Sequence, residues 1–209
     1  MNAALSRLSA GIEKLGLALD DPTRQRLIAY GTLLMKWNKV YNLTAIRDEV
    51  SMIDLHLLDS LAILPHVQHL TRVADIGSGG GLPGIPLAIC RPDCAVALVE
   101  TVGKKASFLL QAKAELGLAN LSVHNLRVEN LKPEQLYPAV SSRAFASLND
   151  FVTLTDHLVA PDGEWVAMKG VYPQDELDAL PSGFRLRESR RLHVPGVDAE
   201  RHLLFITRN

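Results

Sequence analysis

Residues 71–86, TRVADIGSGGGLPGIP, decide the fold of this 209-residue chain. The short apolar run 73–76 predicts a strand, and a cluster of glycines and a proline-started apolar helix follow it. A glycine-rich turn that joins a strand to a helix is a common binding place for a nucleotide-like cofactor in α/β proteins. Gly77, Gly79 and Gly81 are free to adopt positive φ angles, which let the backbone approach a ligand closely. We therefore predict a cofactor-binding turn here.

The acid in this strand, Asp75, separates the candidate cofactors. A turn that holds pyrophosphate presents backbone N–H groups and the positive end of a helix, so a carboxylate there would repel the phosphates. S-adenosylmethionine contains no phosphate, and it carries an ammonium and a sulfonium that an acid attracts. Asp75 therefore favours S-adenosylmethionine as the cofactor and methyl transfer as the reaction.

A dinucleotide is the alternative on spacing alone. The pattern Gly79-x-Gly81-x-x-Gly84 matches the dinucleotide fingerprint, and Glu100 lies about where that fold keeps its ribose-binding acid. Asp75 and an antiparallel pair of strands expected at the end of the chain favour S-adenosylmethionine over NAD. A P-loop is excluded because the chain contains no Gly-Lys-Ser or Gly-Lys-Thr sequence.

The rest of the chain predicts an α/β architecture. After residue 71, short β-rich runs alternate with helical runs, which indicates a parallel sheet with crossover helices. The last two runs, 184–194 and 201–207, have so short a connection that they must pair antiparallel. We therefore expect a Rossmann-like seven-stranded class I methyltransferase sheet in residues 69–209 and an N-terminal helical extension, a cap and RNA-contact region, in residues 1–68. The parallel strands are expected at 72–76, 95–99, 121–125, 139–143 and 163–168, with helices near 83–90, 103–116, 133–136 and 149–159.

The residues that follow each strand are the candidate cofactor contacts, because ligands bind at the carboxyl ends of strands in such sheets. Leu82 could pack on the cofactor, and Glu100 could accept hydrogen bonds from both ribose hydroxyls. Val128 and Glu129 form an apolar–acid step that suits an adenine. The candidate cofactor contacts are Asp75, Gly77, Gly79, Gly81, Leu82, Glu100, Val128, Glu129 and Arg143.

Basic residues are expected near the same edge, although the formal net charge is only −1. A nearly neutral protein can still concentrate positive charge locally, as phosphate contacts require. A second basic stripe, Arg185, Arg187 and Arg191, alternates along one predicted strand. We interpret this stripe as ordinary solvated arginines, because the terminal hairpin should lie far from the cofactor crevice. The basic candidates at the edge are Lys104, Arg127, Arg143, Lys169 and Arg201.

Two segments of the N-terminal region carry polar residues with two possible roles. Trp37, Asn38, Lys39 and Asn42 end the second helix and could stack on and hydrogen-bond an unpaired base. The alternative is a helix end with Trp37 in the core. His56-x-x-Asp59 places two polar side chains one helical turn apart. An active-site edge and a structural network between helices are both open for this pair.

No residue stands out as a catalytic base. A ring nitrogen such as guanine N7 has a free lone pair and no proton to lose, so methyl transfer to it needs only in-line positioning and a suitable field. The Asn-Pro-Pro-Tyr and Asp-Pro-Pro-Tyr sequences common in exocyclic-amine methyltransferases do not occur, nor does a Pro-Cys nucleophile. The two cysteines, Cys90 and Cys94, are interpreted as reduced packing thiols, and no metal site is predicted. No signal peptide or membrane-spanning run is evident, so we expect a cytoplasmic protein without a membrane partner.

The chain also resembles a known family almost from end to end. The matching stretches are Lys36-Trp37-Asn38-Lys39 with Tyr41-Asn42-Leu43-Thr44, His56-x-Leu58-Asp59-Ser60, residues 75–86, residues 142–148, Lys169-Gly170 and Glu200-Arg201-His202. They are similar to those of the bacterial 16S ribosomal RNA (guanine-N7) methyltransferase G family, also called glucose-inhibited division protein B. Gly80 departs from the proline that some members carry.

This resemblance implies methylation of N7 of one guanine in 16S ribosomal RNA, offered as free RNA or as the 30S subunit. It also implies cofactor contacts at Gly77, Leu82, Val128, Glu129 and Arg143. We expect a monomer. The candidates for positioning the substrate are Arg143, Lys169 and Arg201, and the candidate RNA contacts are Trp37, Asn38, Lys39, Asn42, Lys104, Arg127, Lys169 and Arg201.

Two other classes of protein were weighed against this one. A small-molecule or protein methyltransferase would share the cofactor, but the basic strand ends and the lack of a distinct substrate domain argue against it. A regulatory protein that binds the cofactor without reacting is disfavoured, because nothing in the cofactor turn looks degraded.

Overall fold

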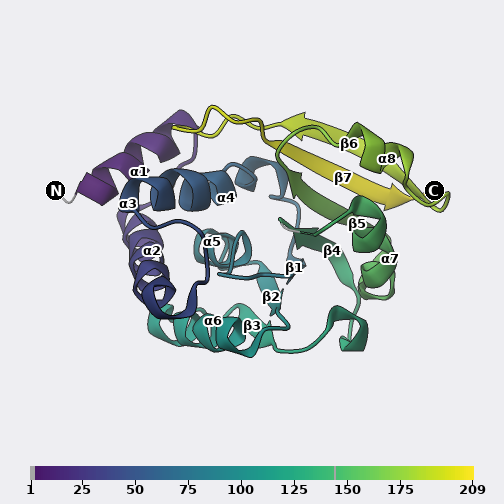
Figure 1. The fold of residues 1–209 in the computed structure, drawn as a ribbon, viewed down its shortest axis with the longest axis horizontal. Coiled ribbons are helices and arrows are strands. Elements are labelled where there is room, and N and C mark those ends of the chain that lie inside the picture. The colour runs from purple at the N-terminus through teal and green to yellow at the C-terminus, as the bar shows by residue number, and fades with distance from the viewer. Residues whose placement is uncertain (1–2, 144) are drawn as a thin grey trace.

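The computed structural model describes residues 3–143 and 145–209, so Ala144, which lies in the matching stretch 142–148, is outside the described residues. A central sheet has the strand order β3-β2-β1-β4-β5-β7-β6 (Figure 1). This order confirms the seven-stranded class I methyltransferase fold. The strands are β1 Arg72–Ile76, β2 Ala95–Val99, β3 Leu121–His124, β4 Tyr137–Ser142, β5 Val159–Lys169, β6 Phe184–Arg191 and β7 His202–Arg208.

The terminal hairpin brings the beginning of β7 and the end of β6 to the carboxyl end of β5. Strands β1 to β5 are parallel, and β7 lies antiparallel between β5 and β6. His202 of β7 is therefore opposite Lys169 of β5 on one side and Arg191 of β6 on the other. The arginine stripe itself lies on the edge strand β6, which β4, β5 and β7 separate from β1, so it lies away from the glycine turn as expected.

Helices cover both faces of the sheet. Helices α5 and α6 pack on β2 and β3, and α2 packs on both of these helices, whereas α7 contacts β5 on the other face. No helix of the described residues is long and apolar enough to cross a membrane. The helices are α1 Ala3–Lys14, α2 Asp21–Tyr41, α3 Glu49–Met52, α4 Asp59–Leu61, α5 Gly84–Cys90, α6 Gly103–Leu116, α7 Leu148–Thr155 and α8 Gln174–Asp178.

The helix expected near residues 133–136 is absent, and this prediction is wrong. A single 3-10 turn, Val128–Asn130, precedes it instead, and the chain then runs without helix to β4. Pro133 gives the physical reason, because a proline disfavours the helical conformation of the residue before it and leaves too few residues for a helix before the strand.

Local capping explains the ends of two long helices. The side chain of Asp20 accepts a hydrogen bond from Thr23 N at 2.9 Å and so caps the beginning of α2. Pro22 lies in the first turn, where its missing N–H costs nothing. Gly117 ends α6 with φ 62°, a left-handed conformation that glycine adopts readily.

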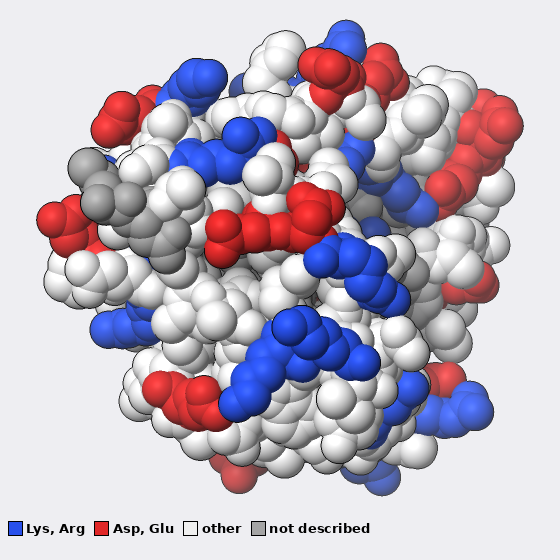
Figure 2. All heavy atoms as spheres, turned by 60° about the vertical axis from the view of Figure 1, so that its left-hand side comes forward, with Lys and Arg blue, Asp and Glu red and all other residues white. Residues whose placement is uncertain are grey.

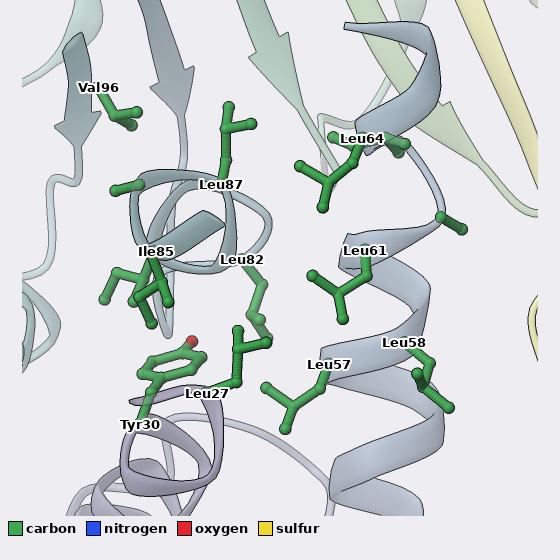
Figure 3. Packing of buried hydrophobic residues seen from close by; sticks show 14 of the residues in the cluster. Leu27, Tyr30, Leu57, Leu58, Leu61, Leu64, Leu82, Ile85, Leu87 and Val96 are labelled. Atoms are coloured by element: carbon green, nitrogen blue, oxygen red, sulfur yellow. The ribbon is translucent and has the colours of Figure 1, made fainter. Parts of the chain in front are cut away.

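The N-terminal helices share one core with the sheet. Leucines of α2 and of the segment 57–64 pack against Leu82 and Ile85 of the α5 region (Figure 3). The Tyr30 hydroxyl donates a hydrogen bond to the Gly80 carbonyl at 2.6 Å, which joins α2 directly to the glycine turn. The border near residue 69 is therefore a change of architecture inside one continuous hydrophobic core.

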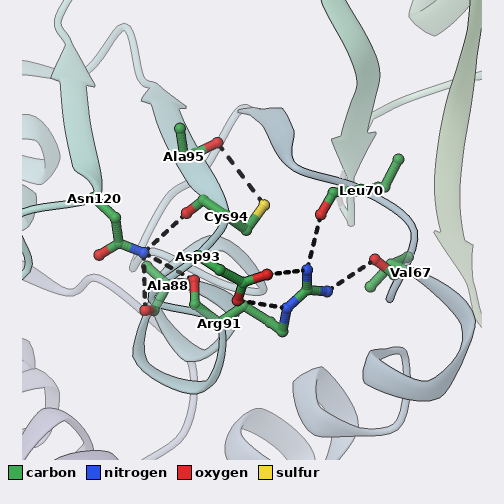
Figure 4. Close-up of polar contacts among 8 residues, drawn as sticks. All are labelled: Val67, Leu70, Ala88, Arg91, Asp93, Cys94, Ala95 and Asn120. Atoms are coloured by element: carbon green, nitrogen blue, oxygen red, sulfur yellow. Dashed lines mark hydrogen bonds and ion pairs between the residues drawn. The ribbon is translucent and has the colours of Figure 1, made fainter.

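Polar contacts fasten the end of α5 to its neighbours (Figure 4). The Arg91 guanidinium pairs with Asp93 at 2.7 Å and donates to the carbonyl of Leu70 at 3.0 Å. The Asn120 amide donates to the carbonyls of Ala88, Arg91 and Cys94. These bonds satisfy carbonyls that the helix end leaves without partners and so fix how α5 enters the sheet.

Candidate functional site

The glycine turn after β1 has the backbone that the sequence predicts. Gly77, Gly79 and Gly81 have φ angles of 69°, 57° and 90°, a region that other residues rarely adopt. No heavy atom outside its chain neighbours lies within 4 Å of where a Cβ of Gly77 would be. The turn therefore leaves open space beside Gly77, into which a ligand can fit.

Asp75 lies beneath this turn and is only 1% exposed. Its carboxylate accepts hydrogen bonds from Gly84 N at 3.2 Å and from the Ser141 hydroxyl at 3.3 Å. Burial raises the pKa of Asp75 to about 7, and the Gly84 bond and Arg143 oppose that rise. Asp75 thus holds the beginning of α5 against β1, and its side chain is shielded from solvent.

Replacing Gly84 with alanine should destabilise this arrangement. A Cβ at residue 84 would lie 2.3 Å from Leu98 Cδ2 and 2.9 Å from Asp75 Oδ2, so the helix must move away from the strand. Overpacking of this kind costs about 1–3 kcal/mol in free energy of unfolding, measurable by urea denaturation. Gly183→Ala, where nothing lies within 4 Å, is the control and should leave the stability nearly unchanged. Equal stabilities of the two variants would contradict this close packing.

Glu100 follows β2 and braces the glycine turn. Its carboxylate accepts hydrogen bonds from Gly79 N at 2.8 Å and from Val102 N at 2.8 Å, and the residue is 5% exposed. Each carboxylate oxygen retains a second lone pair for a further donor. The ribose contact expected of Glu100 stays a prediction, and the structure adds a bracing role that the sequence did not indicate.

An open pocket, which we call the glycine-turn pocket, lies at the carboxyl ends of β1, β2 and β3. Its volume is about 320 Å³. Val128 forms an apolar part of its wall, and the exposed Glu129 adds a carboxylate. Leu82 does not line it, since its side chain is buried in the core. The residues around the pocket are Ile76, Gly77, Val99, Thr101, Arg127, Val128, Glu129 and Phe145, with Leu126 and Leu154.

A second pocket, which we call the arginine pocket, lies at the carboxyl ends of β4 and β5. Its volume is about 330 Å³. The segment after β4 supplies Arg143, β5 supplies Lys169, and the beginning of β7 supplies Arg201 and His202. The three predicted positioning residues therefore surround one cavity. The other wall is Leu55, His56 and Asp59, with Leu192 closing the hairpin side.

Asp59 joins two of these basic residues. Its Oδ1 accepts from Arg201 Nε at 2.7 Å and its Oδ2 lies 3.5 Å from Arg143 Nη1, while the carboxylate is almost fully buried. Lys169 is held separately by Glu176, at 2.8 Å. The Glu176 carboxylate also accepts from Leu148 N at the beginning of α7. Acids thus fix each cation in place in the arginine pocket.

The helix that carries Asp59 contains a π-helical turn, Ile53–Leu58, between α3 and α4. π-helical turns are rare and often lie at functional sites. The wider turn places His56 and Asp59 on the wall of the same pocket. The open question about this pair is settled in part, because the two residues both line the pocket and take part in a network between helices and strands.

His56 is neutral in this network. Its Nε2 lies 2.7 Å from the Thr44 hydroxyl and its Nδ1 lies 3.0 Å from the Leu55 carbonyl, so an Nδ1–H tautomer fits both partners. Burial, reinforced by the charge of Arg143, lowers the pKa of His56 to about 4. A neutral imidazole leaves the positive charge of the pocket to the arginines and the lysine.

The depressed pKa predicts a loss of stability in acid. In the unfolded chain the imidazole binds a proton below pH 6.5, whereas in the folded chain it does so only below about pH 4. The contribution is complete above pH 6.5 and is lost as the pH falls to about 4, amounting to about 3 kcal/mol. Urea denaturation between pH 4 and 7 measures it. His56→Gln should remove this part of the pH dependence, and an equal slope in both proteins would contradict the assignment.

The predicted RNA contacts of the second helix divide into two groups. Lys39 and Asn42 are exposed, as are Lys104 and Arg127. Asn38 is only 2% exposed, donates to the Ile46 carbonyl at 2.7 Å and accepts from Thr44 N at 2.9 Å. Both ends of its amide are therefore occupied by the loop 42–48. This placement does not support the RNA contact expected of Asn38.

Trp37 packs partly into the core, as the alternative interpretation held. Its ring lies 5.2 Å from the Tyr41 ring and 5.7 Å from the Phe108 ring, between centroids. The pocket residues that the sequence did not single out include Leu55, Thr101, Leu126, Leu154, Met168 and Leu192. Phe145 carried a signal, since it lies in the stretch 142–148 that supports the resemblance. Among the described residues, no three His, Cys, Asp or Glu side chains are grouped as metal ligands.

Two solved structures share this fold. The glycopeptide N-methyltransferase MtfA superposes with a TM-score of 0.62 at 10% identity, covering 73% of this chain and 96% of that one. TrmN from Thermus thermophilus superposes with a TM-score of 0.56 at 20% identity, covering 72% of this chain and 48% of that one. At such low identities these likenesses support the fold alone.

Sequence comparison identifies the family. The chain is 59% identical over 206 residues to the ribosomal RNA small subunit methyltransferase G of Aromatoleum aromaticum, covering 97% of this chain and 98% of the relative. It is 62% identical over 202 residues to the protein of that name from Azoarcus sp., covering 97% and 95%. The family model described as rRNA small subunit methyltransferase G matches residues 23–204. The chain therefore belongs to the GidB family of rRNA small subunit methyltransferase G.

Proposed function

We propose that this protein transfers a methyl group from S-adenosylmethionine to N7 of a guanine in the RNA of the small ribosomal subunit. One observation carries the proposal. The glycine-turn pocket and the arginine pocket lie on the two sides of the β1–β4 pair, the point where the strand order of the sheet changes direction. Open α/β sheets bind their ligands at such a point. The family relationship supplies the class of RNA.

The glycine-turn pocket suits the adenosine part of the cofactor. The space beside Gly77 admits a ligand against the backbone, Val128 offers an apolar surface and Glu129 an acceptor. Asp75 lies beneath the turn, where its carboxylate would attract an ammonium bound above it. That positive charge would in turn lower the pKa of Asp75 and favour its ionised form. When bound, S-adenosylmethionine supplies a methyl group activated by the sulfonium. The proposed contacts are Asp75, Gly77, Gly79, Gly81, Glu100, Val128, Glu129 and Arg143. Leu82 is not among them, because its side chain is buried in the core.

The arginine pocket suits the reacting base. Arg143, Lys169 and Arg201 present fixed donors and positive charge, which can orient a guanine through its acceptors and neutralise a neighbouring phosphate. No proton has to leave guanine N7 before it accepts a methyl group, so a neutral His56 and a fully engaged Asp59 are adequate neighbours. The residues of this pocket would act by positioning the lone pair in line with the methyl group.

A methylation assay tests the proposal. Purified protein and S-adenosylmethionine are incubated with 30S subunits, and separately with 16S ribosomal RNA, from a strain that lacks the enzyme. Borohydride–aniline treatment cleaves the RNA at N7-methylguanine. We expect one new cleavage in the small-subunit RNA. Incorporation of methyl groups without cleavage would overturn the N7 assignment, and no incorporation into either substrate would overturn the choice of RNA.

We further propose that the protein acts as a monomer in the cytoplasm, where the small ribosomal subunit is its partner. Lys39, Asn42, Lys104 and Arg127 are the proposed RNA contacts outside the pockets, because their side chains are exposed. Trp37 would contribute through its partly exposed edge. Light scattering of the free protein tests the oligomeric state.

A further inference from the structure

A third pocket lies between the N-terminal helices, and the proposed methyl transfer does not use it. We call it the α2–α3 pocket, and its volume is about 360 Å³. Its walls are apolar, with Ile28 and Met35 from α2 facing Met52 and Leu57 from the helix that follows. The α2 backbone passes close to these side chains at Gly31, where a Cβ would be in ordinary van der Waals contact with Met52 and Leu57, at 3.5 Å.

The rim of the α2–α3 pocket is basic. Lys36, Lys39 and Arg47 line it, with Glu49 as the acid among its lining residues. Within residues 3–143 and 145–209, neither lysine forms an ion pair. The Arg47 guanidinium donates to neutral oxygens, among them Asn42 Oδ1 and the Ile46 carbonyl, both at 3.1 Å. Its charge is therefore held in place without being neutralised, as an anion-binding group would be.

The π-helical turn Ile53–Leu58 is the wall between this pocket and the arginine pocket. Ile53 and Leu57 line the α2–α3 pocket, whereas Leu55 and His56 line the arginine pocket. The two cavities are thus neighbours across one turn of helix. An RNA strand that places one nucleotide in the arginine pocket would pass over this turn to reach the α2–α3 pocket.

Exposed apolar side chains adjoin the lining residues Lys39 and Glu49 in the sequence. Val40 is 70% exposed, Val50 is 51% exposed and Tyr41 is 39% exposed. Figure 2 shows the side of the molecule that carries these helices, where Lys and Arg side chains gather near the middle of the face beside a group of acidic ones. Apolar side chains next to unpaired cations form the combination that holds unstacked nucleotides.

We propose that the α2–α3 pocket is a second nucleotide subsite for the RNA substrate. It takes the base of an unpaired nucleotide near the reacting guanine between its apolar walls, and Lys36, Lys39 and Arg47 hold the adjoining phosphates. The subsite rests on the proposed function, because it names how the same RNA is gripped. Apolar walls are needed for a base and serve no purpose for a lone phosphate, so the occupant is a whole nucleotide.

Two variants separate the phosphate contacts from the base contact. Lys36→Ala with Lys39→Ala removes two cations at the rim, and Lys14→Ala with Lys113→Ala is the control with the same change of charge. Thr32→Trp fills the pocket from an exposed wall position without changing the charge. Arg47 is retained in each variant, because it braces the loop 42–48. The dissociation constant for 16S ribosomal RNA is measured at several salt concentrations, together with kcat and the affinity for S-adenosylmethionine.

The double lysine variant should bind RNA about tenfold more weakly, with a salt slope flatter by about 1.5, while Thr32→Trp weakens binding without changing the slope. Both variants should keep the kcat and the cofactor affinity of the wild type. The subsite would be overturned if the double lysine variant bound RNA as tightly as the Lys14→Ala, Lys113→Ala control. It would also be overturned if Thr32→Trp bound RNA as tightly as the wild type. If the wild type binds the RNA, loses affinity through both variants and yet methylates nothing, the subsite stands and the proposed reaction fails.

Discussion

Replacing Asp59 with asparagine should lower kcat about 100-fold, with a much smaller loss of affinity for S-adenosylmethionine through the shift of Arg143. Asp59 binds Arg201 at 2.7 Å and lies 3.5 Å from Arg143, so one carboxylate sets the position of two cations on the pocket wall. An asparagine has the same shape but no charge, and its NH₂ group would face a guanidinium. Both arginines should then shift away from their positions, and a displacement of about 1 Å is enough for a loss of this size.

The control for this variant is Asp156→Asn. Asp156 also pairs with an arginine, Arg208, at 2.8 Å, but it lies at the opposite end of β5 and β7. Methylation of 30S subunits at saturating cofactor gives kcat, and calorimetry gives the cofactor affinity. A normal kcat for Asp59→Asn would show that the two arginines are placed without the acid. An equal loss in both variants would indicate general destabilisation instead.

Replacing Gly77 with leucine should lower the affinity for S-adenosylmethionine at least about 100-fold, since the side chain would enter the space proposed for the cofactor. Gly77 lines the glycine-turn pocket, and no heavy atom lies within 4 Å of its would-be Cβ. Leucine therefore fits the folded chain sterically. The substitution also lowers the stability of the folded chain by about 1–2 kcal/mol, because a residue with a Cβ must then adopt the positive φ of 69°.

Gly117→Leu is a matched control for that backbone cost. Gly117 has a φ angle of 62°, also has no heavy atom within 4 Å of a would-be Cβ, and ends α6 away from both pockets. Both variants should lose similar stability in urea denaturation, but only Gly77→Leu should lose cofactor binding in calorimetry. Retained binding by Gly77→Leu would move the cofactor away from the glycine turn.

Features that depend on neighbouring residues were predictable from the sequence. The strands β1 and β2 and helix α6 have the expected ranges, and the three glycines of the turn have the expected positive φ angles. Asp48 caps α3 by accepting from Ser51 N at 2.8 Å, and aspartate is a residue type that helix N-caps prefer. Apolar period, capping side chains and glycine conformations act within a few residues, so they can be recognised without knowing the fold.

Features that depend on residues far apart in the chain were not predictable. A local pattern does not show that the amide of Asn38 is consumed by the loop that follows it, or that Glu100 closes the glycine turn. The meeting of Lys169 with His202 has the same origin, because the antiparallel register brings the beginning of β7 beside the end of β5.

The sequence by itself determined the class of fold, the cofactor turn and the family, because each is encoded in short contiguous motifs. Only the tertiary structure decided which polar groups face one another. Asp59 meets Arg143 and Arg201 across 84 and 142 residues of chain, and the π-helical turn that carries its neighbour His56 separates two pockets. Such meetings depend on the packing of α2, the sheet and the terminal hairpin into one core, and the free energy of that packing is spread over the whole chain.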